Sequence, residues 1–390
     1  MRPSDQKAAL PEQDRPVGAC LQAEVSASAL RANLATLRAM VGRGTKLCPV
    51  VKADCYGLGL AACLRVIAEA ADWLAVATPQ EALELRSLGY AGPILAFFSP
   101  SATVREPPGR DVLEELTTRR VTLTVASPDD VEPIARAAAT QGAAEVHVKI
   151  DTGMCRSGVR AEEAAGLIGR LRDRRGIRLT GLYTHFACAD EADLAPTRRQ
   201  LRAFRQAAGP GAGTGVILHA ANSAAIARLP EAHLDMVRPG IAVYGYQPSE
   251  DLLKPLPLRP ALRLWAPLMQ VKAVRPGERC GYGLTYAFDR PGRIGLVPVG
   301  YADGYFRGFS NRATMRLRGR DVPVRGRVSM DQTIIDLTDL PEASVGEEVE
   351  IISPDPHAPH SVENLSRLAG TIPYELISRL GRRARRVLVE

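Results

Sequence analysis

Short apolar runs rich in β-branched residues recur from about residue 24 to 245, and helical patterns lie between them. Eight of these runs are predicted strands, at residues 47–51, 73–77, 94–98, 121–126, 145–150, 179–185, 215–220 and 234–245. Eight strands that alternate with helices over this length are typical of a (β/α)8 TIM-type barrel. A doubly wound open sheet is the alternative, but the sequence lacks the GxGxxG turn of its dinucleotide-binding versions.

Two of the predicted helices have a recognisable first residue. In the first, Thr78 is the expected N-cap, Pro79 the first helical residue and Glu81 the partner that completes a capping box, and Gly89 is expected to end the helix. The Ser-Pro pair at Ser127 repeats the same kind of start. These signals support alternating strands and helices in this part of the chain.

The pattern changes between residues 247 and 267, where five prolines interrupt the helical periodicity. Beyond this point, strands alternate with tight turns, and a short helical segment is expected from Ser361. The sequence therefore predicts a flexible extension at 1–14, a barrel at 15–255 and a mostly β C-terminal domain at 256–390. The arginine-rich run at 382–386 is expected to close a helical segment and to face solvent.

Composition narrows the class of protein. The net charge of +7 comes from 50 basic and 43 acidic residues that are scattered along the chain, and only 5% of residues are aromatic, so nucleic-acid binding has little support. No apolar run is long enough to cross a membrane, and the seven cysteines form no CxxC pair. We therefore expect a cytoplasmic protein with unpaired thiols, no membrane association and no metal site.

Lysine is rare in this chain, because six of the 50 basic residues are lysine and the others are arginine. Lys52 stands at the end of an apolar run in the stretch VVKADCYGLG. A primary amine can lose its proton and form a Schiff base, whereas a guanidinium cannot, which makes Lys52 a candidate for covalent chemistry. A lysine that extends from the end of a core strand into solvent is the simpler explanation.

The ends of the predicted strands carry residues suited to chemistry. They are Lys52, Asp54 and Tyr56 after the first strand, Asp151 and Arg156 after the fifth, His185 after the sixth, His219, Asn222 and Ser223 after the seventh, and Arg238, Gly240 and Ile241 in the eighth. Active sites of (β/α)8 barrels lie where the strands end. The pattern therefore predicts an active site at this end of the barrel.

Motifs along nearly the whole chain resemble those of alanine racemase. They are VVKADCYGLG, VKIDTGMCRSG, YTHFACAD, HAANS, VRPGIAVYG, CGYGLTY, VGYADG, GRVSMDQ and IPYELISRLGRR. The resemblance implies an enzyme that interconverts L-alanine and D-alanine and supplies D-alanine for peptidoglycan. It also implies that pyridoxal 5′-phosphate (PLP) forms a Schiff base with Lys52.

The resemblance implies further roles in holding the cofactor. The residues expected around its phosphate are Tyr56, Asn222, Ser223, Gly240, Ile241 and Tyr374, whose hydroxyls and amides suit a dianion. His185 is also expected near the cofactor, and Arg238 is expected to face the pyridine nitrogen. Because arginine keeps its proton, that nitrogen should stay unprotonated and the ring should be a weakened electron sink.

Racemisation requires one acid–base group on each face of the substrate. The resemblance implies that Lys52 is one group and that Tyr282, contributed by the partner subunit of a homodimer, is the other. A free tyrosine has a pKa of about 10 and is a poor base at neutral pH. His185 and Arg156 match the pair that tunes this tyrosine in the family.

The remaining implied roles concern the substrate and one modification. Arg156 and the backbone N–H of Met330 are expected to bind the substrate carboxylate, and Tyr301 is expected to narrow the entrance. Lys149 matches a lysine that is carbamylated in some members. Two positions depart from many members, which carry histidine in place of Leu58 and cysteine in place of Ser329.

Three other functions stay open on sequence grounds. A serine or broad-specificity amino-acid racemase would use the same cofactor chemistry, and the sequence does not give the pocket volume that separates them. A catalytically silent PLP-binding protein is disfavoured because Tyr282, Tyr301 and Met330 lie in the C-terminal domain. A decarboxylase with this barrel is disfavoured because glycine-rich phosphate motifs are not found.

Overall fold

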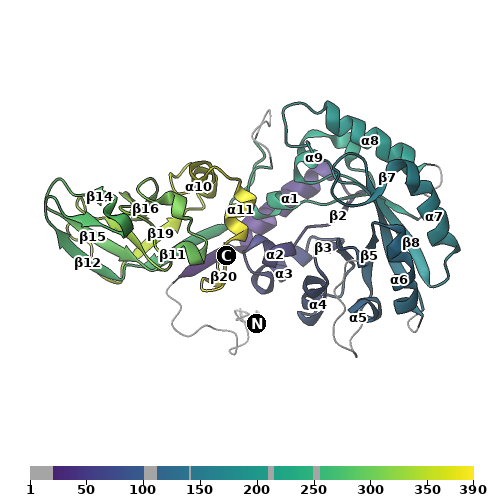
Figure 1. The fold of residues 1–390 in the computed structure, drawn as a ribbon, viewed down its shortest axis with the longest axis horizontal. Helices are drawn as coiled ribbons and strands as arrows, with labels where there is room; N and C mark the ends of the chain where they lie inside the picture. Colours follow the sequence, from purple (N-terminus) through teal and green to yellow (C-terminus); the bar gives the residue numbers. More distant parts are fainter. Residues whose placement is uncertain (1–20, 101–111, 140–141, 210–214, 249–254) are drawn as a thin grey trace, which may run out of the picture. The chain divides into compact units, whose positions relative to one another are not determined.

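The computed structural model describes residues 21–100, 112–139, 142–209, 215–248 and 255–390 (Figure 1). These residues form two compact units. The barrel unit consists of Leu30–Cys55 and Val66–Leu258, and the C-terminal unit consists of Tyr56–Arg65, Arg259–Glu390 and the N-terminal residues up to Ala29. The predicted extension at 1–14 lies outside the described residues.

The barrel unit is built on parallel strands. In spatial order they are β2 (Lys46–Leu47), β10 (Met236–Val237), β9 (Ile217–His219), β8 (Ile177–Tyr183), β6 (Ala144–Asp151), β5 (Val121–Val125), β4 (Ile94–Ala96) and β3 (Leu74–Val76). The first and last strands in this order, β2 and β3, are also joined by the residues that follow β2. Val51 N donates to Ala75 O at 2.9 Å, and Ala75 N donates to Pro49 O at 3.0 Å. The predicted (β/α)8 barrel is confirmed.

Helices follow the strands, and α6 and α7 lie beside β8 (Figure 1). The helices with residues in this unit are α1 (Ala27–Val41), α3 (Leu60–Ala68), α4 (Pro79–Ser87), α5 (Val112–Thr118), α6 (Val131–Ala138), α7 (Ala164–Asp173), α8 (Ala195–Ala208) and α9 (Ser223–Arg228). The predicted start of α4 is confirmed, since Glu81 N donates to Thr78 Oγ1 and the Glu81 carboxylate accepts from Thr78 N.

The eighth strand is much shorter than the run of 234–245 that the sequence predicts. Strand β10 ends at Val237, and residues Ile241–Tyr244 form a 3₁₀ helix. Pro239 has no N–H for a strand ladder, and Gly240 has a backbone conformation of φ −112° and ψ −94° that is far from extended. The chain therefore leaves the sheet immediately after β10.

The C-terminal unit is mostly β. Its sheets follow the orders β17-β16-β19-β11-β1-β20, β12-β15-β18 and β13-β14. The strands are β1 (Gln22–Ser26), β11 (Leu262–Pro267), β12 (Gln270–Val274), β13 (Arg279–Cys280), β14 (Tyr286–Ala287), β15 (Gly292–Val297), β16 (Thr314–Leu317), β17 (Arg320–Pro323), β18 (Thr333–Asp336), β19 (Glu348–Ile352) and β20 (Arg385–Val389), and the helices are α10 (Val362–Ala369) and α11 (Pro373–Ser378).

Strand β1 belongs to this unit although it comes first in the described chain. It pairs antiparallel with β11 and parallel with β20, so that Ala23 faces Leu264 on one side and Arg386 on the other. The two compact units are therefore not separated by one cut in the chain. The predicted domain bounds of 15–255 for the barrel and 256–390 for the C-terminal domain stay a prediction.

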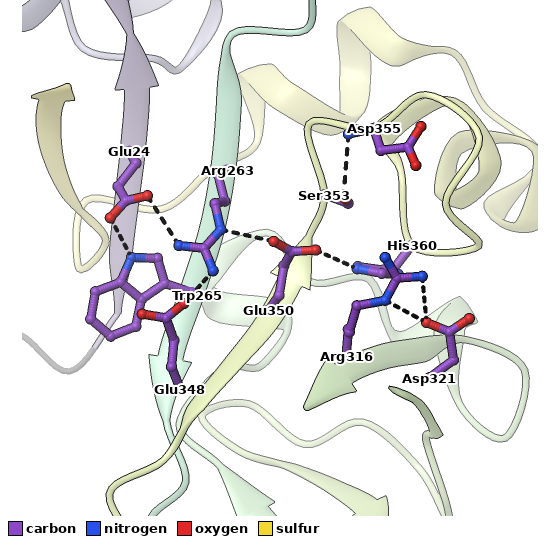
Figure 2. Close-up of polar contacts among 10 residues, drawn as sticks. All are labelled: Glu24, Arg263, Trp265, Arg316, Asp321, Glu348, Glu350, Ser353, Asp355 and His360. Atoms are coloured by element: carbon purple, nitrogen blue, oxygen red, sulfur yellow. Dashed lines mark hydrogen bonds and ion pairs between the residues drawn. The ribbon is translucent and has the colours of Figure 1, made fainter. Parts of the chain in front are cut away.

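An ion-pair network crosses the large sheet of the C-terminal unit (Figure 2). Arg263 donates to Glu24 at 3.1 Å, to Glu350 at 2.8 Å and to Glu348. Glu350 also accepts from Nε2 of the buried His360 at 2.9 Å. Burial alone would raise the pKa of Glu350, but these donors outweigh it and lower the pKa to about 2. The network joins β1, β11 and β19.

The prediction that residues 382–386 end a helix and only face solvent is wrong. Helix α11 ends at Ser378, and the run continues into β20. Arg383 binds both carboxylate oxygens of the buried Asp303, at 2.7 and 2.9 Å. Arg386 donates to the carbonyl oxygen of Gly57 at 3.0 Å. Arginines in this run therefore stabilise the C-terminal unit, because they donate hydrogen bonds to a buried carboxylate and to backbone carbonyl oxygens.

The six cysteines within the described residues are free thiols. In the same part of the chain, no helix has the length and apolar character needed to span a membrane. The described residues also contain no group of three or more histidine, cysteine, aspartate or glutamate side chains arranged to hold a metal ion.

Candidate active site

Lys52 begins a left-handed turn, the short element α2 (Lys52–Tyr56). The φ angles of Ala53, Asp54, Cys55 and Tyr56 are 51°, 55°, 53° and 55°. A left-handed helical conformation costs roughly 1–2 kcal/mol for each residue that has a Cβ atom. Four such residues in a row persist only where surrounding contacts hold them, and strain of this kind is concentrated at functional sites.

The carboxylate of Glu81 holds the start of this turn. Its Oε1 accepts from Ala53 N at 2.7 Å, and its Oε2 accepts from Ala77 N at 2.8 Å and from Thr78 N at 3.0 Å. One carboxylate therefore joins the peptide after Lys52 to the end of β3 and the start of α4. Sequence reasoning identified Glu81 only as a helix cap.

Positive charge is concentrated near Lys52. Burial and the charge of Arg156 lower the pKa of Lys52, whereas the carboxylate of Glu81 raises it. Burial and the charges of Arg156 and Arg238 lower the pKa of Lys149 to about 8. Cations that depress one another's pKa in this way are stabilised by an anion, so the site is suited to an anionic ligand.

Arg238 lies at the start of a buried chain of polar side chains. Its Nη1 donates to Nδ1 of His219 at 2.7 Å, and Nε2 of His219 lies 2.9 Å from Nδ1 of His147. Its Nη2 donates to the carbonyl oxygens of Thr184 at 2.7 Å and Ala220 at 3.1 Å. Burial and the charge of Arg238 lower the pKa of His147 to about 3 and that of His219 well below its usual value. Both imidazoles are therefore neutral.

Tyr183 occupies the centre of this cluster, and sequence reasoning missed it. Its ring stacks on His219, with centroids 4.8 Å apart and planes 9° apart. The Arg238 guanidinium lies 5.3 Å and the Lys149 ammonium 6.0 Å from the ring centroid. Its hydroxyl lies 2.9 Å from Thr124 Oγ1. The tyrosine ring therefore faces two cations, which its π-system attracts.

His185 and Arg156 lie in loops after β8 and β6. Burial and the charges of Arg238 and Arg156 lower the pKa of His185 to about 3, so this imidazole is neutral at physiological pH. The loop that carries Arg156 is fixed by Asp151, which accepts from Gly153 N at 2.9 Å and from Arg156 N at 3.1 Å. Burial would raise the pKa of Asp151, but these amides outweigh it and lower the pKa.

A small cradle of hydroxyl and amide groups forms where β9 and β10 end. Ser223 Oγ accepts from Gly240 N at 2.8 Å, and Ile241 follows Gly240 in the chain. Asn222 Oδ1 accepts from Ala225 N at 3.0 Å and so caps α9. The structure therefore brings the predicted Ser223 and Gly240 together. Asn222 shapes the same turn by holding the first residues of the helix.

The donor set of the barrel unit fits PLP. Lys52 offers a buried amine with a lowered pKa, which suits attachment to an aldehyde. Arg238 offers a fixed cation for a ring nitrogen, and the cradle at Ser223 and Gly240 offers small polar groups for a phosphate. Lys149, Arg156 and neutral His185 complete the predicted set in this unit.

The C-terminal unit carries the other predicted residues. Tyr56 and Tyr374 face one another, with ring centroids 6.1 Å apart. Tyr282, Tyr301 and Met330 expose 71%, 44% and 52% of their surface, respectively, in the single chain.

Tyr301 and Met330 lie on two loops that are joined to one another. Tyr301 N donates to Ser329 O at 3.0 Å, and Ala302 N donates to Met330 O at 3.1 Å. A Cβ atom at Gly300 would lie 2.2 Å from Met330 O, so only glycine allows this approach.

The two positions that depart from many family members differ in their surroundings. Leu58 is fully buried in the C-terminal unit and belongs to its core. Ser329 is partly buried, and its N–H donates to Gln332 O at 3.0 Å.

Comparison with known protein families gives two adjacent matches. Residues 25–248 match the N-terminal domain of alanine racemase, and residues 261–388 match its C-terminal domain. Curated relatives include the alanine racemase of Desulfovibrio desulfuricans, which is 39% identical over 97% of this chain and 99% of its own length. The alanine racemase of Halothermothrix orenii is 38% identical over 93% of this chain and 95% of its own length.

Solved structures agree with these matches. A crystal structure of alanine racemase from Streptomyces lavendulae has a TM-score of 0.87 and 37% identity, and covers 96% of this chain and 98% of its own. Alanine racemase from Clostridium difficile has a TM-score of 0.88 and 34% identity, and covers 96% of this chain and 97% of its own. The chain therefore belongs to the alanine racemase family, whose members are PLP-dependent isomerases.

Proposed function

We propose that this chain interconverts L-alanine and D-alanine with PLP attached covalently to Lys52. The observation that carries the proposal is the cluster of cations around Lys52, in which burial and Arg156 lower the pKa of the lysine amine. A substrate carboxylate and a cofactor phosphate are anions that such a cluster of cations would bind. When bound, the cofactor supplies the electron sink that makes the Cα proton removable.

The proposed phosphate site combines groups from several elements. Its members are Tyr56, Asn222, Ser223, Gly240, Ile241 and Tyr374, with His185 also near the cofactor. The hydrogen bond between Gly240 N and Ser223 Oγ supports the part of the proposal that concerns the barrel. Because these groups are neutral donors, they suit a phosphate without adding charge to the cationic cluster.

Arg238 is proposed to face the pyridine nitrogen and to keep it unprotonated. Its hydrogen bonds to His219 and to two carbonyl oxygens support this role, because they hold the guanidinium plane in one orientation. A guanidinium in such a site cannot give up its proton to the ring. The ring then withdraws fewer electrons, which disfavours side reactions such as transamination.

Two acid–base groups are proposed on opposite faces of the substrate. Lys52 serves one face, and the partner subunit's Tyr282 serves the other, so the active unit is a homodimer. The 71% exposure of Tyr282 in the single chain supports a position that another copy reaches. His185 with Arg156 is proposed to tune this tyrosine, and the neutral imidazole of His185 is able to accept a hydrogen bond from the phenol.

Further proposed roles concern the substrate and Lys149. Arg156 and the Met330 N–H bind the substrate carboxylate, and Tyr301 narrows the entrance. Carbamylation of Lys149 would replace a cation with an anion able to hold Arg156. Only the neutral amine reacts with carbon dioxide, and the lowered pKa of Lys149 supports this reaction.

The cellular role is proposed as the supply of D-alanine for peptidoglycan in the cytoplasm. The free cysteines among the described residues support a reducing compartment. In this arrangement the barrel domain at 15–255 binds the cofactor, and the C-terminal domain at 256–390 completes the site of the partner subunit.

One assay tests the activity. Purified protein is incubated in deuterated solvent with L-alanine, L-serine, L-lysine or L-arginine, and both enantiomers are measured over time. Fastest interconversion of alanine supports the proposal. Faster conversion of serine, or equal rates with all four substrates, would favour a serine or broad-specificity racemase. No exchange with any of them would favour a silent PLP-binding protein.

A further inference from the structure

Two backbone contacts bracket Lys52, and both partners come from β3 and the start of α4. On one side, Val51 N donates to Ala75 O at 2.9 Å. On the other side, Ala53 N donates to Glu81 Oε1 at 2.7 Å. The peptide between Val50 and Val51 and the peptide between Lys52 and Ala53 are therefore both held by the neighbouring β3–α4 segment.

The hydrogen bond from Ala53 N to Glu81 stabilises a strained backbone conformation at Ala53. Ala53 is the first of four consecutive residues in the left-handed region, and its side chain is exposed. Its methyl group therefore has little packing to compensate for an unfavourable φ of 51°. A charged acceptor that binds its N–H supplies that compensation, because hydrogen bonds to carboxylates are stronger than those to neutral groups.

Glu81 is itself held rigidly. Its N–H donates to Thr78 Oγ1 at 3.2 Å, and its second carboxylate oxygen accepts from Ala77 N and Thr78 N. The carboxylate therefore cannot follow the turn if the turn moves. Because the carboxylate is held in place, it fixes the position of the peptide between Lys52 and Ala53.

We propose that Glu81 is a positioning residue for Lys52: its carboxylate fixes the left-handed turn at Ala53 and so aims the lysine side chain at the cofactor aldehyde. The proposal rests on the proposed attachment of PLP to Lys52. Glu81 contacts no reacting atom in this role. In this role it acts through the backbone that carries Lys52.

The test measures how fast PLP attaches to Lys52 in the full-length chain after bound cofactor has been removed with hydroxylamine. Absorbance near ~420 nm follows attachment, and borohydride reduction with peptide mapping locates it. Glu81→Ala is expected to slow attachment roughly ten- to hundred-fold, since it removes a charged acceptor and displaces the nucleophile. Glu81→Gln, which keeps one acceptor oxygen, should lose less.

Two further variants separate positioning from helix stability. Ala53→Gly should restore at least about a third of the rate lost in Glu81→Ala, because glycine adopts a positive φ without strain. Thr78→Ala removes the cap on α4 but leaves the Ala53 contact. It should lower the melting temperature and leave attachment within about two-fold of the parent.

Amide hydrogen exchange at Ala53 gives a readout that needs no cofactor. The parent should protect this amide, and Glu81→Ala should speed its exchange about ten-fold or more. Unchanged exchange and attachment in Glu81→Ala overturn the inference. A loss that Thr78→Ala reproduces and Ala53→Gly does not relieve overturns it as well. If the parent attaches no PLP, the proposed function fails, and exchange at Ala53 alone decides the role of Glu81.

Discussion

Arg238 donates a hydrogen bond from Nη1 to Nδ1 of His219 across 2.7 Å, and both side chains are buried. Because a guanidinium has only donors, His219 must carry its proton on Nε2. That proton points to Nδ1 of His147 at 2.9 Å, so His147 must in turn carry its proton on Nε2. Nε2 of His147 is buried and has no hydrogen-bond partner among the described residues. One arginine therefore sets the tautomers of two histidines.

The first prediction concerns these tautomers. Long-range ¹H–¹⁵N spectra of protein labelled at its six histidines should place the protons of His147 and His219 on Nε2. Arg238→Met removes the donor that sets them and should give a mixture of tautomers at His219. Protonated Nδ1 of His219 in the parent would contradict this assignment. Exposed His357 serves as the internal reference.

The second prediction is that acid destabilises the barrel through His147 and His219. Their pKa values in the folded state lie far below 6.5, so the unfolded chain binds more protons as the pH falls below 6.5. His185, whose pKa is lowered to about 3, contributes in the same way. The free energy of unfolding is therefore highest above pH 6.5 and falls by up to about 4 kcal/mol per pH unit below it, about 1.4 kcal/mol for each of the three histidines. Urea unfolding at several pH values on either side of 6.5 measures this slope.

A matched pair of variants checks the source of the slope. His147→Gln keeps an acceptor for His219 but no longer titrates, so the slope should fall by about 1.4 kcal/mol per pH unit. His357→Gln changes an exposed histidine and should leave the slope unchanged. Equal slopes in parent and His147→Gln would mean that His147 titrates normally in the folded protein.

The third prediction is that Lys149 reacts with carbon dioxide. With a pKa of about 8, roughly a quarter of its amine is neutral at pH ~7.5, far more than for an ordinary lysine. Protein incubated with ¹³C-bicarbonate should show a carbamate signal in ¹³C NMR. Lys149→Gln should abolish this signal, and Lys272→Arg, at an exposed lysine, should not. A signal that survives in Lys149→Gln would assign the carbamate elsewhere.

The fourth prediction tests the shared site. Lys52→Ala and Tyr282→Phe should each be nearly inactive, and mixing them should restore activity up to about a quarter of the parent value. Half of randomly formed dimers are mixed, and each has one intact site of two. Subunit exchange is verified by native mass spectrometry. Verified exchange without recovered activity would show that each chain uses its own Tyr282.

The fifth prediction concerns the two faces of the substrate. Tyr282→Phe should slow deuterium uptake into L-alanine roughly 10²- to 10⁴-fold, while Lys52 still exchanges the α-proton of D-alanine. NMR follows uptake from each enantiomer separately, before appreciable racemisation. Equal losses from both enantiomers would point to one mobile base and would reduce Tyr282 to a positioning role.

Most of the sequence predictions that the structure confirms rest on patterns formed by residues close together in the sequence. Thr78, Pro79 and Glu81 predicted the start of α4 because a capping box involves only neighbours in the chain. The barrel followed from eight apolar runs in series. The last run was predicted too long, since the apolar residues of 241–244 fit a strand as well as the buried 3₁₀ helix that they form.

The missed features depend on contacts between distant residues. Tyr183 and His147 lie inside predicted strands, where an alternating pattern marks them only as buried. The pairing of β1 with β11 and β20 joins residues more than 200 positions apart, which no local pattern encodes. The arginines at 383 and 386 were read as solvated because their carbonyl and carboxylate partners are distant in sequence.

The position of β1 between β11 and β20 has a consequence for synthesis on the ribosome. The barrel residues up to Leu258 are translated before either partner of β1. A nascent chain of that length therefore carries an unpaired strand β1, whose edges stay open until β11 and β20 have been made. Until then, the exposed edges of β1 are open to pairing with other chains, which makes this strand a target for a chaperone that holds unfolded segments.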